Sequence, residues 1–173
     1  FMQAYSKELA RDRNDAVKLY SEVIDLYPDV TWVSVNARYR LGCTQISMGE
    51  KKAGNATISE LLADSSAVGN PVIADAALME ADRLWAEKKI EEAVGLWLSL
   101  LDQSYHRSSR DQWVSARQKL MITSFVTGKF GDFETALFAV MPEDNAKVRR
   151  ERIDEAFSVY YNCFTSGWWH WMV

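Results

Sequence analysis

The hydrophobic positions of this chain recur with the period of an α-helix, most clearly between residues 85 and 101. This stretch ends one predicted helix, turns through residues 87–89 and begins a second helix. In the second helix the apolar side chains recur at i, i+3, i+4 and i+7, which places them on one face. They are Ile90, Ala93, Val94, Trp97, Leu100 and Leu101. The stretch therefore predicts two helices joined by a short turn.

Similar helix pairs are predicted along most of the chain, and the turns inside them are evenly spaced. The turns fall near Asp12, Gly49, Lys88, Gly128 and Gly167, at intervals of 37, 39, 40 and 39 residues. A period of this length with two helices per period is typical of an α-solenoid, in which each repeat packs against its neighbours. A four-helix bundle would not give five evenly spaced turns.

The fold class follows from this spacing. We predict an all-α, right-handed α-α superhelix (solenoid) of stacked helix-turn-helix repeats, with about four to five hairpins. We expect residues 1–173 to form a single repeat domain of this kind. In the predicted register both ends of the chain cut a hairpin, so we expect the domain to be a fragment of a longer protein.

The composition excludes several classes of protein. The chain is 48% hydrophobic and 25% charged, which is ordinary for a folded domain and not for a disordered one. Its net charge of −4 argues against a nucleic-acid partner, because nonspecific binding of that kind needs a basic face. No apolar run approaches the roughly 20 residues of a membrane span, and residues 1–5 do not look like a signal peptide.

The histidines, the cysteines and the absence of known catalytic motifs predict that the chain is not an enzyme. The two histidines, His106 and His170, have no neighbouring histidine or cysteine at metal-ligand spacing. The chain also lacks the HExxH, Cys-x-x-Cys, P-loop and Gly-x-Ser-x-Gly motifs. Cys43 and Cys163 lie about three repeats apart, too far for a disulfide if each repeat adds about 10 Å. We therefore predict no catalytic residue, metal or cofactor, and two free thiols.

Three groups of residues resemble the tetratricopeptide repeat (TPR) family. They are Ala16–Tyr20–Val23–Pro28, Leu41–Gly42 with Gly49, and Ala81 with Ala93–Trp97. Residues 27–42 also look like the linker of bacterial envelope repeat proteins that act in outer-membrane assembly or cell-wall coordination. This second likeness implies a bacterial protein of the periplasm or envelope, while the rest of the chain leaves the cytoplasm open.

The chain departs from the TPR pattern in several places. Its period exceeds the usual 34 residues. Gly54 stands where a helix-packing alanine is normal, and Glu80 stands at an expected leucine position. The fourth repeat, which contains Gly131, fits poorly. Longer helical-hairpin repeats of the HEAT or Sel1-like kind therefore stay open.

The TPR resemblance implies a function. In that family the first helices of the repeats line a concave groove that takes an extended or helical segment of a partner protein. The register implies eight partner-binding residues: Asn36, Tyr39, Asp75, Asp82, Trp85, Gln118, Phe125 and Tyr161. The alternative for the aromatic members is simple packing between helices. Asp75 and Met79 replace the basic clamp of repeats that bind acidic chaperone tails, so we do not expect such a tail as the partner.

The C-terminal stretch carries three tryptophans within four residues, Trp168, Trp169 and Trp171. One interpretation is that they cap the last repeat. The others are an anchor at a membrane interface or an association patch for a partner or a second copy of the chain. We therefore expect a non-catalytic protein-interaction scaffold. The alternative is a spacer or self-association module that uses the tryptophan tail, and a helical enzyme domain ranks lower.

Overall fold

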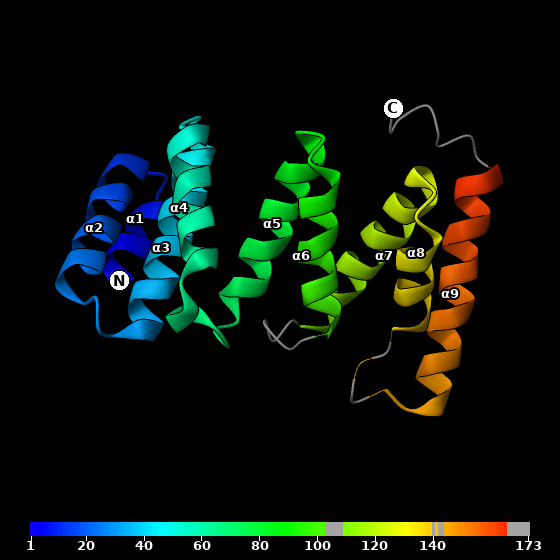
Figure 1. Ribbon diagram of the computed structural model, residues 1–173. Helices are drawn as coiled ribbons and strands as arrows, with labels where there is room; N and C mark the ends of the chain where they lie inside the picture. Colours follow the sequence, from blue (N-terminus) through cyan, green and yellow to red (C-terminus); the bar gives the residue numbers. More distant parts are fainter. Residues whose placement is uncertain (103–108, 140, 142–143, 166–173) are drawn as a thin grey trace. The chain divides into compact units, whose positions relative to one another are not determined.

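The computed structural model describes residues 1–102, 109–139, 141 and 144–165 (Figure 1). The described residues contain α-helices and one short 3-10 helix and no strand. The chain divides into two compact units, Phe1–Glu80 (unit 1) and Ala81–Val173 (unit 2). The prediction of a single domain over residues 1–173 stays a prediction. No helix among the described residues has the length and apolar character needed to cross a membrane.

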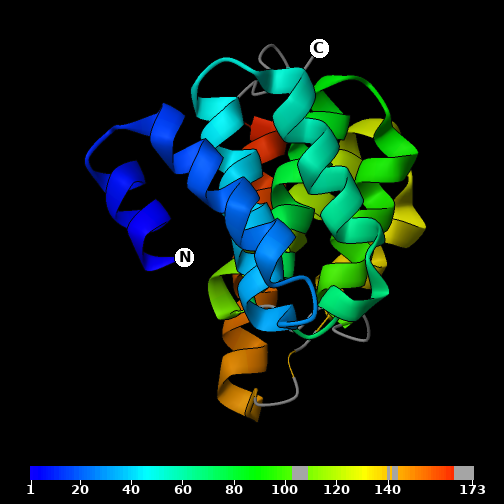
Figure 2. The same ribbon diagram turned by 90° about the vertical axis from the view of Figure 1, so that its left-hand side faces the viewer.

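Unit 1 is built from helices that pack in chain order. Helix α1 packs on α2, α2 on α3, and α3 on α4, and both views show this succession in blue to cyan (Figure 1, Figure 2). The short helix η1 packs against α3 and α4. The bounds are α1 Met2–Leu9, α2 Arg13–Leu26, α3 Thr31–Ser47, α4 Lys51–Ala63, η1 Ser65–Ala67 and α5 Val72–Ala86, the last of which contains the division between the units.

Unit 2 follows the same order. Helix α6 packs on α7, α7 on α8, and α9 contacts both α7 and α8. Helix α7 begins with a capping box, in which the Ser109 hydroxyl accepts from the Gln112 backbone and the Gln112 side chain accepts from the Ser109 backbone. The bounds are α6 Ile90–Asp102, α7 Arg110–Thr127, α8 Phe130–Phe138 and α9 Ala146–Thr165.

Four turns inside the helix pairs share one conformation. Arg11, Gly49, Lys88 and Gly128 have positive φ angles of 62°, 90°, 64° and 72°. Each donates its N–H to the carbonyl three residues earlier, and the next residue donates to the carbonyl five residues earlier. The following helices begin two residues after the left-handed residue, at Arg13, Lys51, Ile90 and Phe130. This bonding pattern is the Schellman motif, which satisfies the last carbonyls of a helix.

These turns confirm the predicted organisation. They coincide, within one residue, with the predicted turns at Asp12, Gly49, Lys88 and Gly128. The predicted turn at Gly167 lies outside the described residues. The all-α fold of consecutively packed helical hairpins is therefore confirmed for the described part of the chain.

The core of unit 1 consists of two clusters of buried side chains, both of which include residues of α3. The first contains Ala4, Ala16, Tyr20, Val23, Ala37 and Leu41. The second contains Val35, Ile58, Leu61, Ala67, Ile73 and Ala76. Helix α3 therefore contributes side chains to both clusters. In unit 2 the largest buried side chains include Trp97 and Trp113, and the indole N–H of Trp113 donates to the Leu101 carbonyl at 3.1 Å.

Candidate functional site

Three of the eight predicted partner-binding residues lie in unit 1, and they share a surface. Asn36 and Tyr39 are on α3, and Asp75 is on the part of α5 that belongs to unit 1. With 3.6 residues per turn, positions 32, 36, 39 and 43 lie on one side of α3. We call the surface made by Trp32, Asn36, Tyr39, Arg40, Cys43 and Asp75 the first-helix face of unit 1.

Trp32 is the exposed aromatic residue of this face. Its relative exposure is 61%, although one edge of its ring lies against Phe1, with centroids 6.3 Å apart. The side-chain amide of Asn36 donates to the Trp32 carbonyl at 2.7 Å, which fixes Asn36 one turn after the tryptophan. Sequence reasoning missed Trp32. Its spacing of four residues before Asn36 and seven before Tyr39 is the signal that could have found it.

Tyr39 is half-buried and packs against the second core cluster of unit 1. Burial raises the pKa of its phenol above the ordinary value, and the neighbouring Cys43 and Asp75 raise it further. The phenol is therefore neutral at physiological pH. Tyr39 thus packs against the core while part of its side chain stays exposed, and its role in partner binding stays a prediction.

Arg40 is held in place by two residues of α1. Its guanidinium carbon lies 4.8 Å from the centroid of the Tyr5 ring, within the range of a cation–π contact. Its Nη1 lies 3.4 Å from Oε1 of Glu8. The hydroxyl of the buried Tyr20 donates to the other oxygen of Glu8 at 2.6 Å, so the carboxylate itself is fixed. Arg40 is therefore a positioned cation on this surface, and sequence reasoning did not place it in the site.

Cys43 closes the face toward α5. Its thiol is half-buried and lies 3.8 Å from the sulfur of Met79. Burial raises the pKa of the Cys43 thiol above its ordinary value, so the thiolate is disfavoured. Cys43 is a free cysteine, as the sequence predicts. Its environment is that of a packing residue and not of an activated nucleophile.

Two of the predicted residues of unit 2, Asp82 and Gln118, take part in polar contacts between helices. Asp82 pairs with Lys119 of α7 at 2.5 Å, and the Gln118 amide donates to Glu155 of α9 at 2.9 Å. Each of these two pairs joins residues 37 apart, which is close to one repeat. They therefore link successive first helices of unit 2.

The aromatic candidates of unit 2 differ from one another. Trp85 is half-buried, and its ring packs against that of Trp97 with centroids 6.2 Å apart. Phe125 is also half-buried on α7. Tyr161 is 66% exposed on α9, one turn after Phe157, which is 58% exposed. Of the three predicted residues Trp85, Phe125 and Tyr161, only Tyr161 is mostly exposed to solvent. Trp168, Trp169 and Trp171 lie outside the described residues.

Within the described ranges, no group of three or more His, Cys, Asp and Glu side chains is arranged to hold a metal ion. Comparison of the chain with protein-family models, with curated proteins and with solved structures gives no match.

Proposed function

We propose that this chain is a non-catalytic protein-interaction scaffold that binds a segment of a partner protein on the first-helix face of unit 1. The observation that carries the proposal is the exposure of Trp32 beside Asn36 and the positioned cation of Arg40. Tryptophan, tyrosine and arginine are the residue types most enriched among the energetically dominant residues of protein interfaces.

Each group has a distinct part in the proposed contact. The Trp32 ring offers a large apolar area at a low entropic cost, since its side chain has only two rotatable bonds. The Asn36 Nδ2 donates to the Trp32 carbonyl. The Asn36 Oδ1 accepts no hydrogen bond from the described residues, so it can accept one from a backbone N–H of the partner. Arg40 presents guanidinium donors to a carbonyl or carboxylate.

The first-helix face of unit 1 is suited to a protein or peptide as the partner. Its polar groups are fixed before binding, because Glu8 and Tyr5 hold Arg40 and the Trp32 carbonyl holds Asn36. Fixed donors and acceptors lower the ordering cost of association. An extended or helical segment that lies along α3 would meet Trp32, Asn36 and Tyr39 in succession.

We further propose that the chain is a divergent relative of the TPR family. Support comes from the four equivalent turns at Arg11, Gly49, Lys88 and Gly128, which follow one another at 38, 39 and 40 residues. Buried Ala16, Tyr20 and Val23 occupy the second-helix positions that carry the resemblance. With this relationship we also propose a role in the assembly of a bacterial envelope complex. The alternative to a TPR relative is a repeat protein of the HEAT or Sel1-like kind.

The test compares variants of two exposed aromatic residues of unit 1, Trp32 and Tyr27. Wild type, Trp32→Ala and Tyr27→Ala are immobilised and exposed to a lysate of the source cells, and a protein retained by the wild type is then purified and titrated against each. Tyr27 is 52% exposed and lies after α2, so its removal controls for the loss of an exposed aromatic ring. We expect Trp32→Ala to weaken binding at least tenfold, as for a dominant interface residue, and Tyr27→Ala to have little effect.

Equal binding by wild type and Trp32→Ala, with both variants showing wild-type helical circular dichroism, would contradict the proposal. In that case Tyr161→Ala on α9 tests the exposed predicted residue of unit 2. Loss of binding in Tyr161→Ala alone would move the site to unit 2.

A further inference from the structure

Successive first helices contact each other through the same two positions. The first helices α1, α3, α5 and α7 are each followed by a left-handed turn residue, which sets a common register. In three consecutive steps the residue six positions before one turn contacts the residue nine positions before the next turn. We name these the receiving position and the reaching position. The pairs are Tyr5 with Arg40, Cys43 with Met79, and Asp82 with Lys119.

The contacts differ in chemistry but use the same places on the helices. The guanidinium carbon of Arg40 lies 4.8 Å from the centroid of the Tyr5 ring. The sulfurs of Cys43 and Met79 are 3.8 Å apart. All three reaching residues have long, flexible side chains, and all three are half-buried. A long side chain at this position therefore spans the distance to the preceding first helix.

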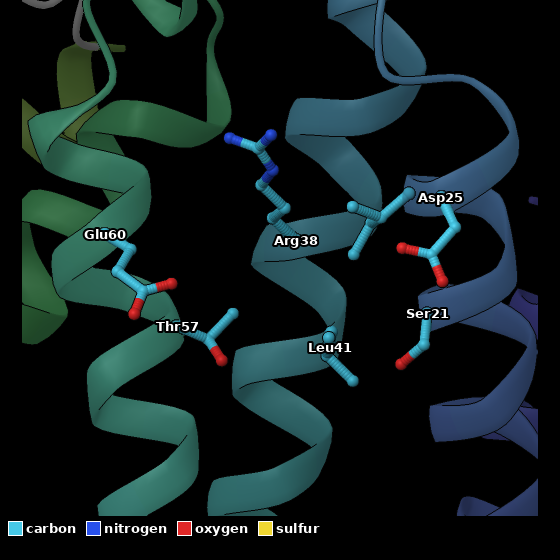
Figure 3. Close-up of a pocket in the computed structure, with 7 residues that line it drawn as sticks. Ser21, Asp25, Arg38, Leu41, Thr57 and Glu60 are labelled. Carbon is cyan, nitrogen blue, oxygen red and sulfur yellow. The ribbon is translucent and has the colours of Figure 1, made fainter.

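The receiving position does not face the second helices. In unit 1, Figure 3 shows Leu41 of α3 with α2 and α4 on either side of it. Cys43 lies about 200° around α3 from Leu41, since each residue advances a helix by about 100°. The receiving position is thus directed along the succession of first helices.

Met2 occupies the reaching position of α1. It lies nine residues before Arg11, as Arg40 lies nine residues before Gly49. Its relative exposure is 72%, whereas the three equivalent residues of α3, α5 and α7 are half-buried. Met2 is therefore a long, exposed apolar side chain at the position through which the later first helices contact the first helix before them.

Tyr161 occupies the receiving position of α9. It lies six residues before Gly167, where the sequence predicts the next turn, and its relative exposure is 66%. The Gln118 amide donates to Glu155, which marks the side of α9 that faces α7. Tyr161 lies about 240° around the helix from Glu155, away from that side. The Tyr161 ring therefore has the place on α9 that the Tyr5 ring has on α1.

Exposed apolar side chains are most numerous on these same two helices. Among the described side chains, α1 exposes Met2 and Leu9, and α9 exposes Phe157 and Tyr161. Each other described helix exposes one large apolar side chain at most. Exposed apolar side chains that gather on one surface are typical of association sites.

We propose that a second copy of this chain packs its α1 beside α9, with its Met2 on the Tyr161 ring. The contact continues the succession of first helices from one copy to the next, because Met2 and Tyr161 stand at the two positions that pair within the chain. A thioether against an aromatic ring is a favourable contact. The interface joins different surfaces of the two copies, so it can repeat into longer assemblies. It does not use Trp32 and is independent of the proposed partner site.

The test is sedimentation velocity of the full chain up to millimolar concentration, for the wild type and for variants with wild-type helical circular dichroism. Met2→Asp and Tyr161→Asp each remove one half of the contact. Leu26→Asp is the matched control, because Leu26 is 70% exposed on α2. We expect the wild type and the control to associate equally as the concentration rises. We expect Met2→Asp and Tyr161→Asp each to weaken association at least tenfold.

A mixture of the two interface variants tests the geometry. The Met2→Asp chain keeps its Tyr161, and the Tyr161→Asp chain keeps its Met2, so an equimolar mixture contains one complete contact. We expect one-to-one pairs in the mixture and no larger species. A contact between two identical surfaces gives no such rescue.

The proposal fails if the wild type stays monomeric at millimolar concentration, or if the mixture forms no pairs. It also fails if either interface variant associates as tightly as the wild type, or if Leu26→Asp loses association to the same extent as the interface variants. Association of both interface variants that is lost only when Trp168 and Trp171 are changed to alanine would assign self-association to the C-terminal tail instead.

Discussion

Gly42 and Gly54 bring the backbones of α3 and α4 into contact. A β-carbon placed on Gly54 would lie 2.6 Å from the carbonyl oxygen of Gly42 and 2.6 Å from Cγ1 of Ile46. Both distances are far below ordinary van der Waals separation, and one of the two atoms belongs to the backbone. Gly54 departs from the TPR pattern, which has alanine there, because the two helices approach too closely for a methyl group.

Gly54→Ala should therefore destabilise unit 1. We expect a loss of about 1–3 kcal/mol in the free energy of unfolding, since a small-to-large change in a packed contact forces the helices apart. Gly95→Ala is the matched control, because a β-carbon on Gly95 in α6 meets no atom within 4 Å. We expect the control to gain about 0.5–1 kcal/mol from helix propensity. Urea unfolding followed by circular dichroism measures both, and a Gly54→Ala protein as stable as wild type would refute the close contact.

The left-handed turn residues give a second pair of opposite effects. Lys88 has a φ angle of 64°, which costs free energy for a residue with a β-carbon, whereas Gly128 occupies the equivalent place with φ of 72°. We expect Lys88→Gly to stabilise unit 2 by about 0.5–1 kcal/mol and Gly128→Ala to destabilise it by about 1 kcal/mol. Thermal unfolding of the two variants beside wild type is the measurement. A lower melting temperature for Lys88→Gly would contradict the assigned turn.

Arg38 and Arg117 occupy equivalent positions, 79 residues apart, as do the turn residues Gly49 and Gly128. Arg117 is 1% exposed, and its guanidinium donates to the carbonyls of Ala136 and Leu137 in the last turn of α8 at 2.8 and 3.2 Å. Arg38 instead pairs with Asp64, and both side chains are partly exposed.

Truncation of these two arginines should have unequal effects. We expect Arg117→Met to destabilise unit 2 by about 2–4 kcal/mol, because it leaves one buried and one partly buried carbonyl without their donors. We expect Arg38→Met to cost less than about 1 kcal/mol, as is usual for a solvent-accessible ion pair. Urea unfolding of both variants under the same conditions compares them. Equal losses would show that Arg117 does not act through the α8 carbonyls.

Asp64 makes the stability of unit 1 sensitive to acid. Hydrogen bonds from the Ser66 hydroxyl and backbone N–H, and then the ion pair with Arg38, hold the pKa of this carboxyl below its ordinary value of 3.8. A carboxyl with a lowered folded-state pKa stabilises the fold fully above its unfolded pKa. That contribution is lost as the pH falls through the folded-state pKa.

The pH dependence is measured against Asp64→Asn, which keeps the shape of the side chain and removes the charge. We expect the difference in unfolding free energy between wild type and Asp64→Asn to be constant from pH 7 to about 5 and to shrink below about pH 4. Urea unfolding at a series of pH values gives this difference. A difference that grows as the pH falls would contradict the assigned interactions of Asp64.

The helical hairpins could be predicted from the sequence because they depend on local signals. The apolar spacing in residues 90–101 and the glycines at positions 49 and 128 act within a few residues along the chain. The contact between Gly42 and Gly54 could not be predicted in the same way. The contact arises from how closely α3 and α4 approach each other. A repeat pattern with alanine at position 54 carries no information about that distance.

The candidate site was predictable only in part. The register located Asn36, Tyr39 and Asp75 on predicted first helices, but it did not include Trp32. Asp82 and Gln118 were predicted as groove residues from the same register. Their pairing with Lys119 and Glu155 depends on side-chain reach between neighbouring helices, which the hydrophobic period does not specify.

The most direct test of the interaction proposal is hydroxyl-radical footprinting of the wild-type chain, alone and with the protein that it retains from the lysate. Trp32 and Tyr27 are 61% and 52% exposed, so both oxidise readily in the free chain, and mass spectrometry quantifies each. If the partner covers the first-helix face of unit 1, oxidation of Trp32 falls severalfold and that of Tyr27 is unchanged. Oxidation of Trp32 at the same rate in the free chain and in the complex would contradict the proposed site.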